Sequence, residues 1–457
     1  NLASPSAQLR TEPLGTFIIK GETLSSRLES IVASQRFSQL MVATIIGFVL
    51  FKRFYRDIGD VFFMITFIGT LLSIFYNFKK IKKDPIYIAF FISIAIPLLS
   101  WINSIVAIPD LAMPKPSPFF FYSFFIFWFI AYWTRGNTNI IAGILIAYCL
   151  SALGIFISNS SDFFGEIYAG ISGSRIDFNV VNAQHTSLFS GFGLIASIFL
   201  LLARTTASKH LKLLKSSLAI AFFLFFLLIT VITQSRQVWL SLLLCFLAAP
   251  LTLKLLPQSR ISTKAVVLSY IALFFVLMAL STSQIVSKRI GAETDNIKNA
   301  ATLDIESIPN SGSVGIRINL WIEAWQWFKM RPLLGSGENA RELVISESDN
   351  FSDAMKSSFS HLHNSHIESL VSFGIVGTVF IYFLIFFPVI TVSKSPKGVT
   401  GNTWRIFATT TAIFWITVNC FESFFFSWNG IYVFSVFYGI IYSFQFKKND
   451  RLLTGPP

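Results

Sequence analysis

The chain has 457 residues, of which 53% are hydrophobic and only 13% are charged, and its net charge is +13 at neutral pH. A soluble fold of this size would have to expose the excess apolar surface to water, so the composition excludes an ordinary soluble domain. In a soluble protein the basic excess would suggest nucleic-acid binding, but here Lys and Arg lie in short segments beside long apolar runs. We therefore expect a membrane protein with no nucleic-acid partner.

About twelve apolar runs are suited to cross a hydrocarbon core of about 30 Å as helices. The first run is the shortest, and Lys52, Arg53 and Arg56 follow it. The pair near 217–255 is separated only by the sequence QSRQ, so it is either a hairpin or one bent element. The expected spans are 38–52, 58–78, 85–107, 119–134, 139–158, 186–203, 217–234, 238–255, 265–285, 367–393, 406–426 and 430–446. The pattern predicts an all-α polytopic membrane protein with one large helical external loop.

Basic residues gather in five connecting or terminal segments that fall on one side of the membrane if the chain crosses twelve times. The positive-inside rule makes that side cytoplasmic, and the turn with Arg53 and Arg56 is the one exception. Residues 1–37 show no signal-peptide pattern. The expected organisation is a cytoplasmic segment at 1–37, helices 1–9 at 38–285, an external loop domain at 286–366, helices 10–12 at 367–446 and a cytoplasmic tail at 447–457.

The long loop carries a helical pattern of its own at 316–330. Its apolar residues recur at three- and four-residue steps, at Ile316, Leu320, Trp321, Ala324, Trp325 and Phe328. A stripe rich in Trp suits a helix lying at the membrane interface, and it equally suits a helix packed on the rest of the loop. The sequence RPLLGSGEN at 331–339 ends this helix with Pro and Gly.

Two arginines are candidates for binding an anionic group. Arg236, in TQSRQVW, stands at the external end of a span, where a guanidinium is costly unless it faces protein or water. Gln234, Ser235 and Gln237 add hydrogen-bonding groups around it, although an interfacial, snorkelling Arg also explains the position. Arg317 begins the loop helix and is either a site residue or an ordinary solvated side chain.

Three of the five histidines lie within the sequence HLHNSHIE. Ser365 and Glu368 form an S-x-x-E capping box that predicts the start of a membrane helix, so Glu368 is either a cap or a site residue. His363 then precedes a helix N-terminus, whose positive end favours a neutral, proton-accepting imidazole and also a nearby phosphate. The competing interpretation is zinc binding by H-x-H-x-x-H, for which no fourth ligand stands out.

Together these segments resemble the O-antigen ligase and O-antigen polymerase superfamily of bacterial envelopes. The resemblance rests on the dozen spans, the Q-S-R turn after a central span and the long external loop. The sequences GIRINLWIEAW, PLLGSG, HNSHIE and FGIVG resemble the superfamily motifs R-x-x-x-W, P-x-x-G-x-G, H-N-x-x-(L/I)-E and G-x-x-G. Polymerases and protein O-oligosaccharyltransferases share the pattern. The modest length and the S-V-G-I-R and H-L-H-N segments favour a lipopolysaccharide ligase.

The resemblance implies a glycosyltransferase of the bacterial inner membrane, with its site facing the periplasm and with no metal or other cofactor. The donor would be an O-antigen glycan on undecaprenyl diphosphate, and the acceptor a sugar hydroxyl of lipid A-core, both among membrane lipids. The superfamily's functional positions correspond to Arg236, Arg317 and His363. The arginines would stabilise the leaving diphosphate, and His363 would be the base. The residues expected to bind substrate are Arg175, in the 159–185 loop, and Gln234, Asn364 and Glu368.

A transporter of the same lipid-linked glycan is a second functional class. It also needs many helices and basic residues, but it predicts charges near the bilayer midplane and an inverted repeat. The candidate charges here lie at the external ends of the predicted spans, and the sequence shows no convincing internal repeat. These features favour the transferase.

Overall fold

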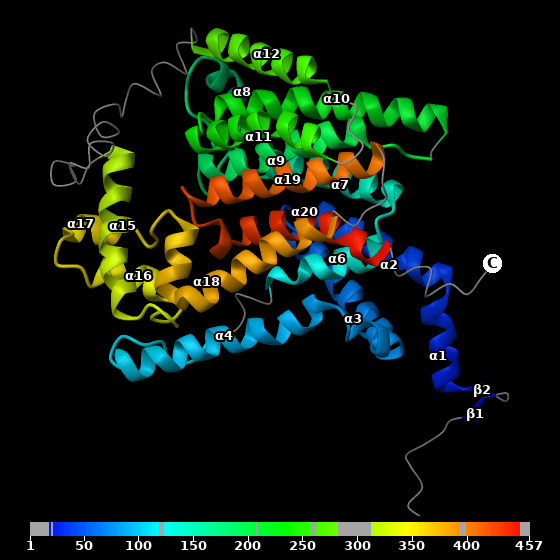
Figure 1. The fold of residues 1–457 in the computed structure, drawn as a ribbon, viewed down its shortest axis with the longest axis horizontal. Helices are drawn as coiled ribbons and strands as arrows, with labels where there is room; N and C mark the ends of the chain where they lie inside the picture. Colours follow the sequence, from blue (N-terminus) through cyan, green and yellow to red (C-terminus); the bar gives the residue numbers. More distant parts are fainter. Residues whose placement is uncertain are drawn as a thin grey trace, which may run out of the picture.

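The computed structural model is a bundle of long helices with several shorter helices at one end (Figure 1). It describes residues 18–19, 22–117, 123–206, 208–256, 262–281, 312–392 and 399–447. Within these ranges the strands are β1 (Ile18–Ile19) and β2 (Glu22–Thr23), which pair antiparallel. The remaining elements are helices, so the all-α prediction is confirmed.

Each expected span contains a helix. These helices are α2 (Gln35–Phe51), α3 (Arg56–Ile81), α4 (Pro85–Ala107), α6 (Ile126–Thr134), α7 (Thr138–Asn159), α9 (Ala183–Leu202), α10 (Lys209–Ile232), α11 (Arg236–Leu255), α12 (Thr263–Ser281), α18 (Ser365–Val392), α19 (Val399–Asn419) and α20 (Trp428–Lys447). Seven of the described helices are long and apolar enough to cross a membrane, namely α3, α4, α7, α9, α10, α11 and α18. An eighth crossing results if α1 (Leu24–Ala33) and α2, which meet at 61°, form one bent span.

Helix α20 is not among these seven, and its central position in the bundle explains why it is less apolar. Nearly every described side chain of α20 is buried among its neighbours, and these include the polar Ser435 and Ser443. A helix that faces protein rather than lipid need not be apolar all round. On outer helices, by contrast, large apolar side chains are exposed, such as Phe75 at 75% and Leu213 at 68%. This is the arrangement expected of a polytopic helical membrane protein.

The QSRQ segment forms a reversing turn between two separate spans. Trp239 Nε1 donates to the carbonyl of Thr230 at 3.0 Å. In one continuous helix these residues would lie about 13 Å apart along the axis, so the contact requires the chain to fold back. Gln234, with φ at 50°, stands in the turn. The hairpin interpretation is therefore correct.

Helix α18 is broken at Gly374, where φ is 64°. The loop segment PLLGSG pairs with the backbone groups that the break releases. Ser336 N donates to Val371 O at 2.8 Å, and Ile375 N donates to Pro332 O at 2.8 Å. Within a membrane such groups must be satisfied by protein, so the loop segment and the broken helix stabilise each other.

Glycine is required on both sides of this contact. A Cβ atom on Gly335 would lie 2.5 Å from the backbone of Ser372, and one on Gly374 would overlap the carbonyl of Leu333. Both residues also have positive φ angles, which favour glycine. The PLLGSG and FGIVG motifs are thus two halves of one structural contact.

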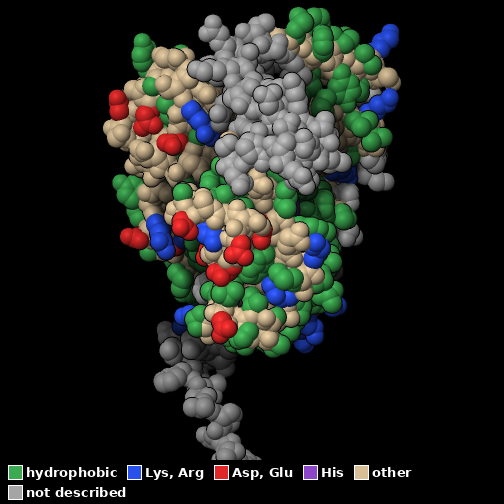
Figure 2. Space-filling model, turned by 90° about the vertical axis from the view of Figure 1, so that its left-hand side faces the viewer, with side chains coloured by type: hydrophobic (Ala, Val, Ile, Leu, Met, Phe, Trp, Pro, Cys, Tyr) green, Lys and Arg blue, Asp and Glu red, His purple; other side chains and the backbone are tan. Residues whose placement is uncertain are grey.

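The described part of the long loop has a small core of its own. Helices α15 (Gly312–Met330), α16 (Ala340–Ser346) and α17 (Asp353–Ser358) contribute to it, together with the start of α18. Leu320 and Ala324 of the predicted stripe are fully buried there, whereas Trp325 is 53% exposed. The stripe therefore packs mainly on the rest of the loop. Figure 2 views this end of the molecule, where acidic and basic side chains are scattered over the surface. Residues 286–311 of the predicted loop lie outside the described residues.

Candidate active site

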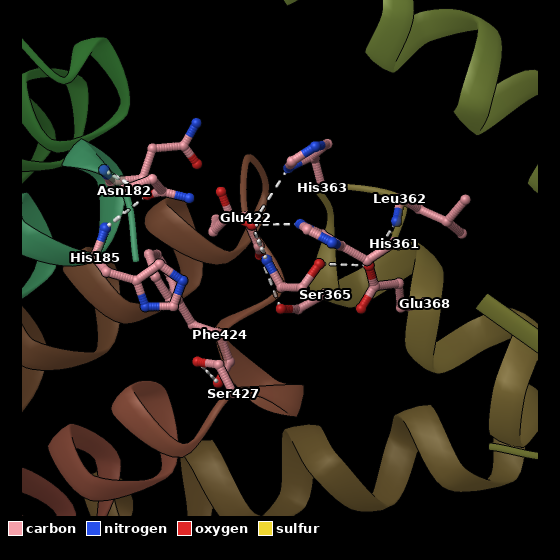
Figure 3. Close-up of polar contacts among 12 residues, drawn as sticks. Asn182, His185, His361, Leu362, His363, Ser365, Glu368, Glu422, Phe424 and Ser427 are labelled. Atoms are coloured by element: carbon pink, nitrogen blue, oxygen red, sulfur yellow. Dashed lines mark hydrogen bonds and ion pairs between the residues drawn. The ribbon is translucent and has the colours of Figure 1, made fainter. Parts of the chain in front are cut away.

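Several chain segments meet at the end of the bundle where α18 begins (Figure 3). They are the turn before α18, the turn between α19 and α20, the first turn of α9 and the helix α15. Trp321 of α15 donates from Nε1 to the carbonyl of Leu362 at 2.9 Å. This bond fixes α15 against the turn before α18, residues 361–364, which we call the histidine turn. The site thus joins the long loop to the membrane helices.

Glu422 is at the centre of this cluster, and two adjacent histidines approach its carboxylate from the same side (Figure 3). Its Oε1 atom lies 3.0 Å from His361 Nε2 and 3.3 Å from His363 Nδ1. The backbone N–H of Ser423 donates to the same oxygen at 3.1 Å. The side chain of Glu422 is only 2% exposed, against 29% for His361 and 15% for His363. A buried carboxylate with three such neighbours is held in one orientation.

These contacts keep Glu422 ionised. Burial alone would raise the pKa of Glu422, but hydrogen bonds and charge from His361 and His363 outweigh burial and hold the pKa well below its usual value. An ionised carboxylate only accepts hydrogen bonds, so the nitrogens facing it carry protons. On His363 this leaves Nε2 as the proton-accepting atom of the neutral ring.

The two histidines respond differently to the shared carboxylate. Burial lowers the pKa of His361, but the hydrogen bond and charge of Glu422 outweigh it and raise the pKa above its ordinary value. For His363 burial is the largest effect and lowers the pKa, and the charges of His361 and Arg317 lower it further against the opposing effect of Glu422. His361 is therefore the histidine that takes up charge, and His363 the one that stays neutral.

Arg317 joins the cluster through Gln184, in the first turn of α9. With its amide nitrogen turned toward the carboxylate, Gln184 donates to Glu422 Oε2 and accepts from Arg317 Nη2 at 3.0 Å. Arg317 also contributes to the pKa of His363. The structure thus brings together Arg317 and His363, two of the three predicted functional residues, from positions 46 residues apart in the sequence.

The predicted capping box is wrong. Asn364, not Ser365, caps α18, because its Oδ1 atom accepts from His366 N at 3.0 Å and from Ile367 N at 3.2 Å. Ser365 instead donates to Asn419 Oδ1 at 2.7 Å and so ties α18 to the end of α19. Asn364 is itself buried. Its side chain holds the helix start beside His363.

Glu368 is fully buried beneath the histidine turn. Its Oε1 atom accepts from the backbone N–H of Leu362 at 2.8 Å and from the hydroxyl of Ser423. These bonds link the histidine turn to the α19–α20 turn, which carries Glu422. Glu368 thus holds the two turns together, and its contact with substrate stays a prediction.

Gln234 and Arg236 lie at a second turn, that between α10 and α11, and Arg175 reaches this turn from the segment between α8 and α9. Gln234 Nε2 donates to Gly173 O at 2.9 Å, and Arg175 Nε donates to Thr233 O at 3.3 Å. Arg236 is the first residue of α11 and is half-buried. The two predicted substrate-binding side chains thus make backbone contacts at the turn that precedes Arg236.

The packing of α11 on α19 shows where Arg236 lies along the bundle relative to Glu422. Cys245 Sγ contacts Thr410 O at 3.4 Å, while Val238 and Phe414 both lie against Gly191. The two helices are therefore antiparallel, and Arg236 lies near the level at which α19 ends and the turn with Glu422 begins.

The three-histidine metal site is not formed. His366 lies in α18 and points elsewhere, with Nε2 at 3.0 Å from Ile416 O and Nδ1 at 2.8 Å from Tyr382 Oη. A different trio, His361, His363 and Glu422, places its ligand-type atoms within 4.8 Å of one another. Two imidazoles and a carboxylate are of the type that binds zinc, so chelation belongs among the tests of function.

Glu422 and Gln184 are the site residues that the sequence analysis missed. Glu422, in NCFESFF, was included in a predicted span without being considered as a site. An ionisable residue within an apolar run is by default a functional candidate, and this signal was available. Gln184 gives no such signal, because its contacts are with residues far away in the sequence.

The fold and this cluster define a polytopic helical membrane protein with a histidine–carboxylate–arginine site at one end of its bundle. Residues 220–382 match the family model described as O-antigen ligase, which is just over a third of the chain and includes Arg236, Arg317 and His363. No curated protein matches the chain. The family match supports the superfamily that the motifs resemble, and with it a glycosyltransferase-type enzyme of the O-antigen ligase or polymerase kind.

Proposed function

We propose that this protein is an O-antigen ligase, which transfers a glycan from undecaprenyl diphosphate to a sugar hydroxyl of lipid A-core at the periplasmic face of the bacterial inner membrane. The observation that carries the proposal is the pairing of His363 Nδ1 with the ionised Glu422, which leaves Nε2 able to accept a proton. The family match over residues 220–382 supports the same type of chemistry.

The proposed reaction is a displacement at the anomeric carbon of the donor sugar. The acceptor hydroxyl gives its proton to His363 Nε2 as its oxygen bonds to that carbon. The bond from the carbon to the diphosphate oxygen breaks, and its electron pair leaves with the diphosphate. Glu422 stabilises the imidazolium that forms, as a buried carboxylate does beside a catalytic histidine.

The leaving diphosphate needs positive charge, which we assign to Arg317 and Arg236. A guanidinium stays charged and binds phosphate oxygens through two parallel N–H groups. Arg317 shares the bridging amide of Gln184 with Glu422, so it is held within the cluster. We assign Arg236 to the same task because it starts α11 near the level of the turn that carries Glu422. Preorganised charge of this kind replaces a metal ion in the proposal.

Gene deletion distinguishes the proposed activity from its relatives. Loss of all long-chain lipopolysaccharide bands supports a ligase, whereas retention of a single glycan repeat on the core indicates a polymerase. A normal lipopolysaccharide profile with altered protein glycosylation indicates a protein O-oligosaccharyltransferase. The transporter hypothesis is less well supported, since the histidine–carboxylate cluster lies at helix ends rather than midway along the spans.

Chelation tests the absence of a metal. We expect the purified protein to transfer glycan after EDTA treatment, because the arginines provide the charge. Loss of activity on EDTA treatment that one divalent ion restores would contradict this expectation and assign His361, His363 and Glu422 to a metal.

A further inference from the structure

The turn between α2 and α3 contains three basic residues, and one of them differs from the other two. Lys52 pairs with Asp60, and Arg56 lies 3.6 Å from the same carboxylate with its side chain 82% exposed. Arg53 instead points into the bundle, where Nη2 donates to Asn429 Oδ1 in the first turn of α20. Of the basic residues in the turn that departs from the positive-inside pattern, Arg53 is thus the one that faces inward.

The charge of Arg53 has no counter-ion among the residues that the structure describes. None of their carboxylates lies within 4.0 Å of its guanidinium, and its Nε atom is buried without a hydrogen-bond partner. Burial lowers the pKa of Arg53, which reflects the cost of keeping this charge away from water. A buried cation with an unsatisfied N–H group destabilises a protein unless an anion compensates for it.

Two side-chain hydrogen bonds link Arg53 to His185, which lies beside the candidate active site. Asn429, which accepts from Arg53, also contacts His185 Nδ1 through Nδ2 at 3.0 Å. His185 follows Gln184, the residue that bridges Glu422 and Arg317. The ring of His185 packs edge-on against Phe424, two residues after Glu422, at 5.2 Å between ring centres. Arg53 and Arg317 are therefore linked by hydrogen bonds to two neighbouring residues of α9, Arg53 to His185 through Asn429 and Arg317 to Gln184.

We propose that Arg53 forms a second phosphate-binding position of this site, on the other side of the first helical turn of α9 from Arg317. The inference rests on the proposed function, which brings lipid-linked phosphate groups to this end of the bundle. A phosphate oxygen is an acceptor that suits a guanidinium whose Nη2 is fixed by an amide and whose Nε–H lacks a partner. The phosphate belongs to the diphosphate of the donor or to the phosphorylated acceptor lipid, and the two sources are separable by experiment.

The test compares Arg53→Gln with Arg56→Gln in the full-length protein held in phosphatidylcholine nanodiscs. The second substitution removes the same charge three residues away from an exposed side chain, so it is the matched control. Binding is measured for farnesyl diphosphate, which represents the donor, and for diphosphoryl lipid A, which represents the acceptor. We expect Arg53→Gln to weaken farnesyl diphosphate binding by at least about tenfold and Arg56→Gln to leave both affinities within about twofold.

A melting measurement without ligand separates binding from a structural role. Arg53→Gln should melt at the wild-type temperature or above it, because it removes a buried charge that nothing compensates. Loss of lipid A binding alone would support the same site with the acceptor as its source. Unchanged affinity for both lipids would overturn the inference, as would a lower melting temperature with unchanged affinity. If the wild type binds neither lipid, the proposed function fails together with this inference.

Discussion

The carboxylate of Glu422 gives two neighbouring histidines different tasks. Both hydrogen-bond to the same oxygen, yet only His361 has its pKa raised, while that of His363 is lowered. A base must be neutral to accept a proton, so the lowered pKa suits His363 for this role at neutral pH. The pair therefore combines a partner of Glu422 that takes up a proton more readily than an ordinary histidine with an adjacent proton acceptor.

Replacement of His363 is the direct test of the base. His363→Ala should lower the turnover rate by roughly 10²–10⁴-fold while binding of the donor changes little. His366→Ala is the better control, because His366 contacts Ile416 and Tyr382 rather than Glu422. His361→Ala is less suitable than the sequence alone indicates, since it removes a partner of Glu422. Equal loss in the His363 and His366 variants would favour a folding role.

The pH dependence tests Glu422 as a positioning residue. Transfer should rise with pH through the pKa of His363, below the ordinary histidine value of about 6.5. Glu422→Gln removes the charge that favours imidazolium, so the rising limb should move to lower pH and the turnover rate should fall at least about tenfold. A rate measured from pH 4 to pH 8 checks both effects. A limb that does not move would show that Glu422 does not act through His363.

The sequence predicted His363 and Arg317 as site residues but did not predict their shared partners. Histidines near a predicted helix start are visible as a local pattern, and the resemblance added Arg317. Glu422 and Gln184 contact His363 and Arg317 only because α19, α20 and α9 pack beside the histidine turn. No local spacing encodes a contact between residues that are 59 positions apart, as His363 and Glu422 are. The assignment of Glu368 to a capping box failed for the same reason, since its partner Ser423 comes from another turn.

At the scale of elements, the interlocked glycine motifs hold the site together. The PLLGSG segment docks at the break in α18, and Ser100 of α4 donates to Ser372 O at that break at 2.5 Å. Asn103 of the same helix donates to Gly335 O at 2.7 Å. Three separate parts of the chain thus meet about three helical turns after His363, and they fix the direction in which α18 leaves the site.

Gly374→Ala tests this interlock. Alanine is unfavourable at a φ of 64°, and its Cβ would overlap the carbonyl of Leu333. We expect a loss of about 1–3 kcal/mol of stability, measured as a lower melting temperature in detergent. Gly143→Ala in α7 is the matched control, since the nearest atom to its Cβ would be 3.4 Å away, and it should be neutral. Equal melting temperatures for the two variants would contradict a structural role for the break.

Helix positions were predictable to within a few residues in most spans because apolar length governs them. The prediction was less accurate for α10, which begins at Lys209 rather than 217, and for α19, which spans Val399–Asn419 rather than 406–426. The short helix α8 (Phe163–Ile171) and the break at Gly374 were not predicted. The sequence FGIVG reads as an uninterrupted apolar helix, and only the docking of a distant loop segment explains why it opens there.

At the scale of the whole molecule, most of the basic turns lie at the end of the helices opposite the site, and the Arg53 turn is the exception. Helix α9 begins beside Glu422 and ends just before Arg204. Helix α3 begins just after the Arg53 turn and ends among Lys79, Lys82 and Lys83. This arrangement agrees with the charge asymmetry used to predict an external site.

Cysteine labelling tests that orientation directly. Ser357 is exposed in α17, on the side of the loop, and Lys209 is exposed at the start of α10, on the opposite side. In a background with Cys420 replaced by Ser, since Cys149 and Cys245 are buried, Ser357→Cys should react with an impermeant thiol reagent once the outer membrane is permeabilised. Lys209→Cys should react only after the inner membrane is broken, because the positive-inside rule places it in the cytoplasm. The reverse labelling pattern would place the His363–Glu422 cluster in the cytoplasm, away from the proposed acceptor, and so exclude transfer at the periplasmic face.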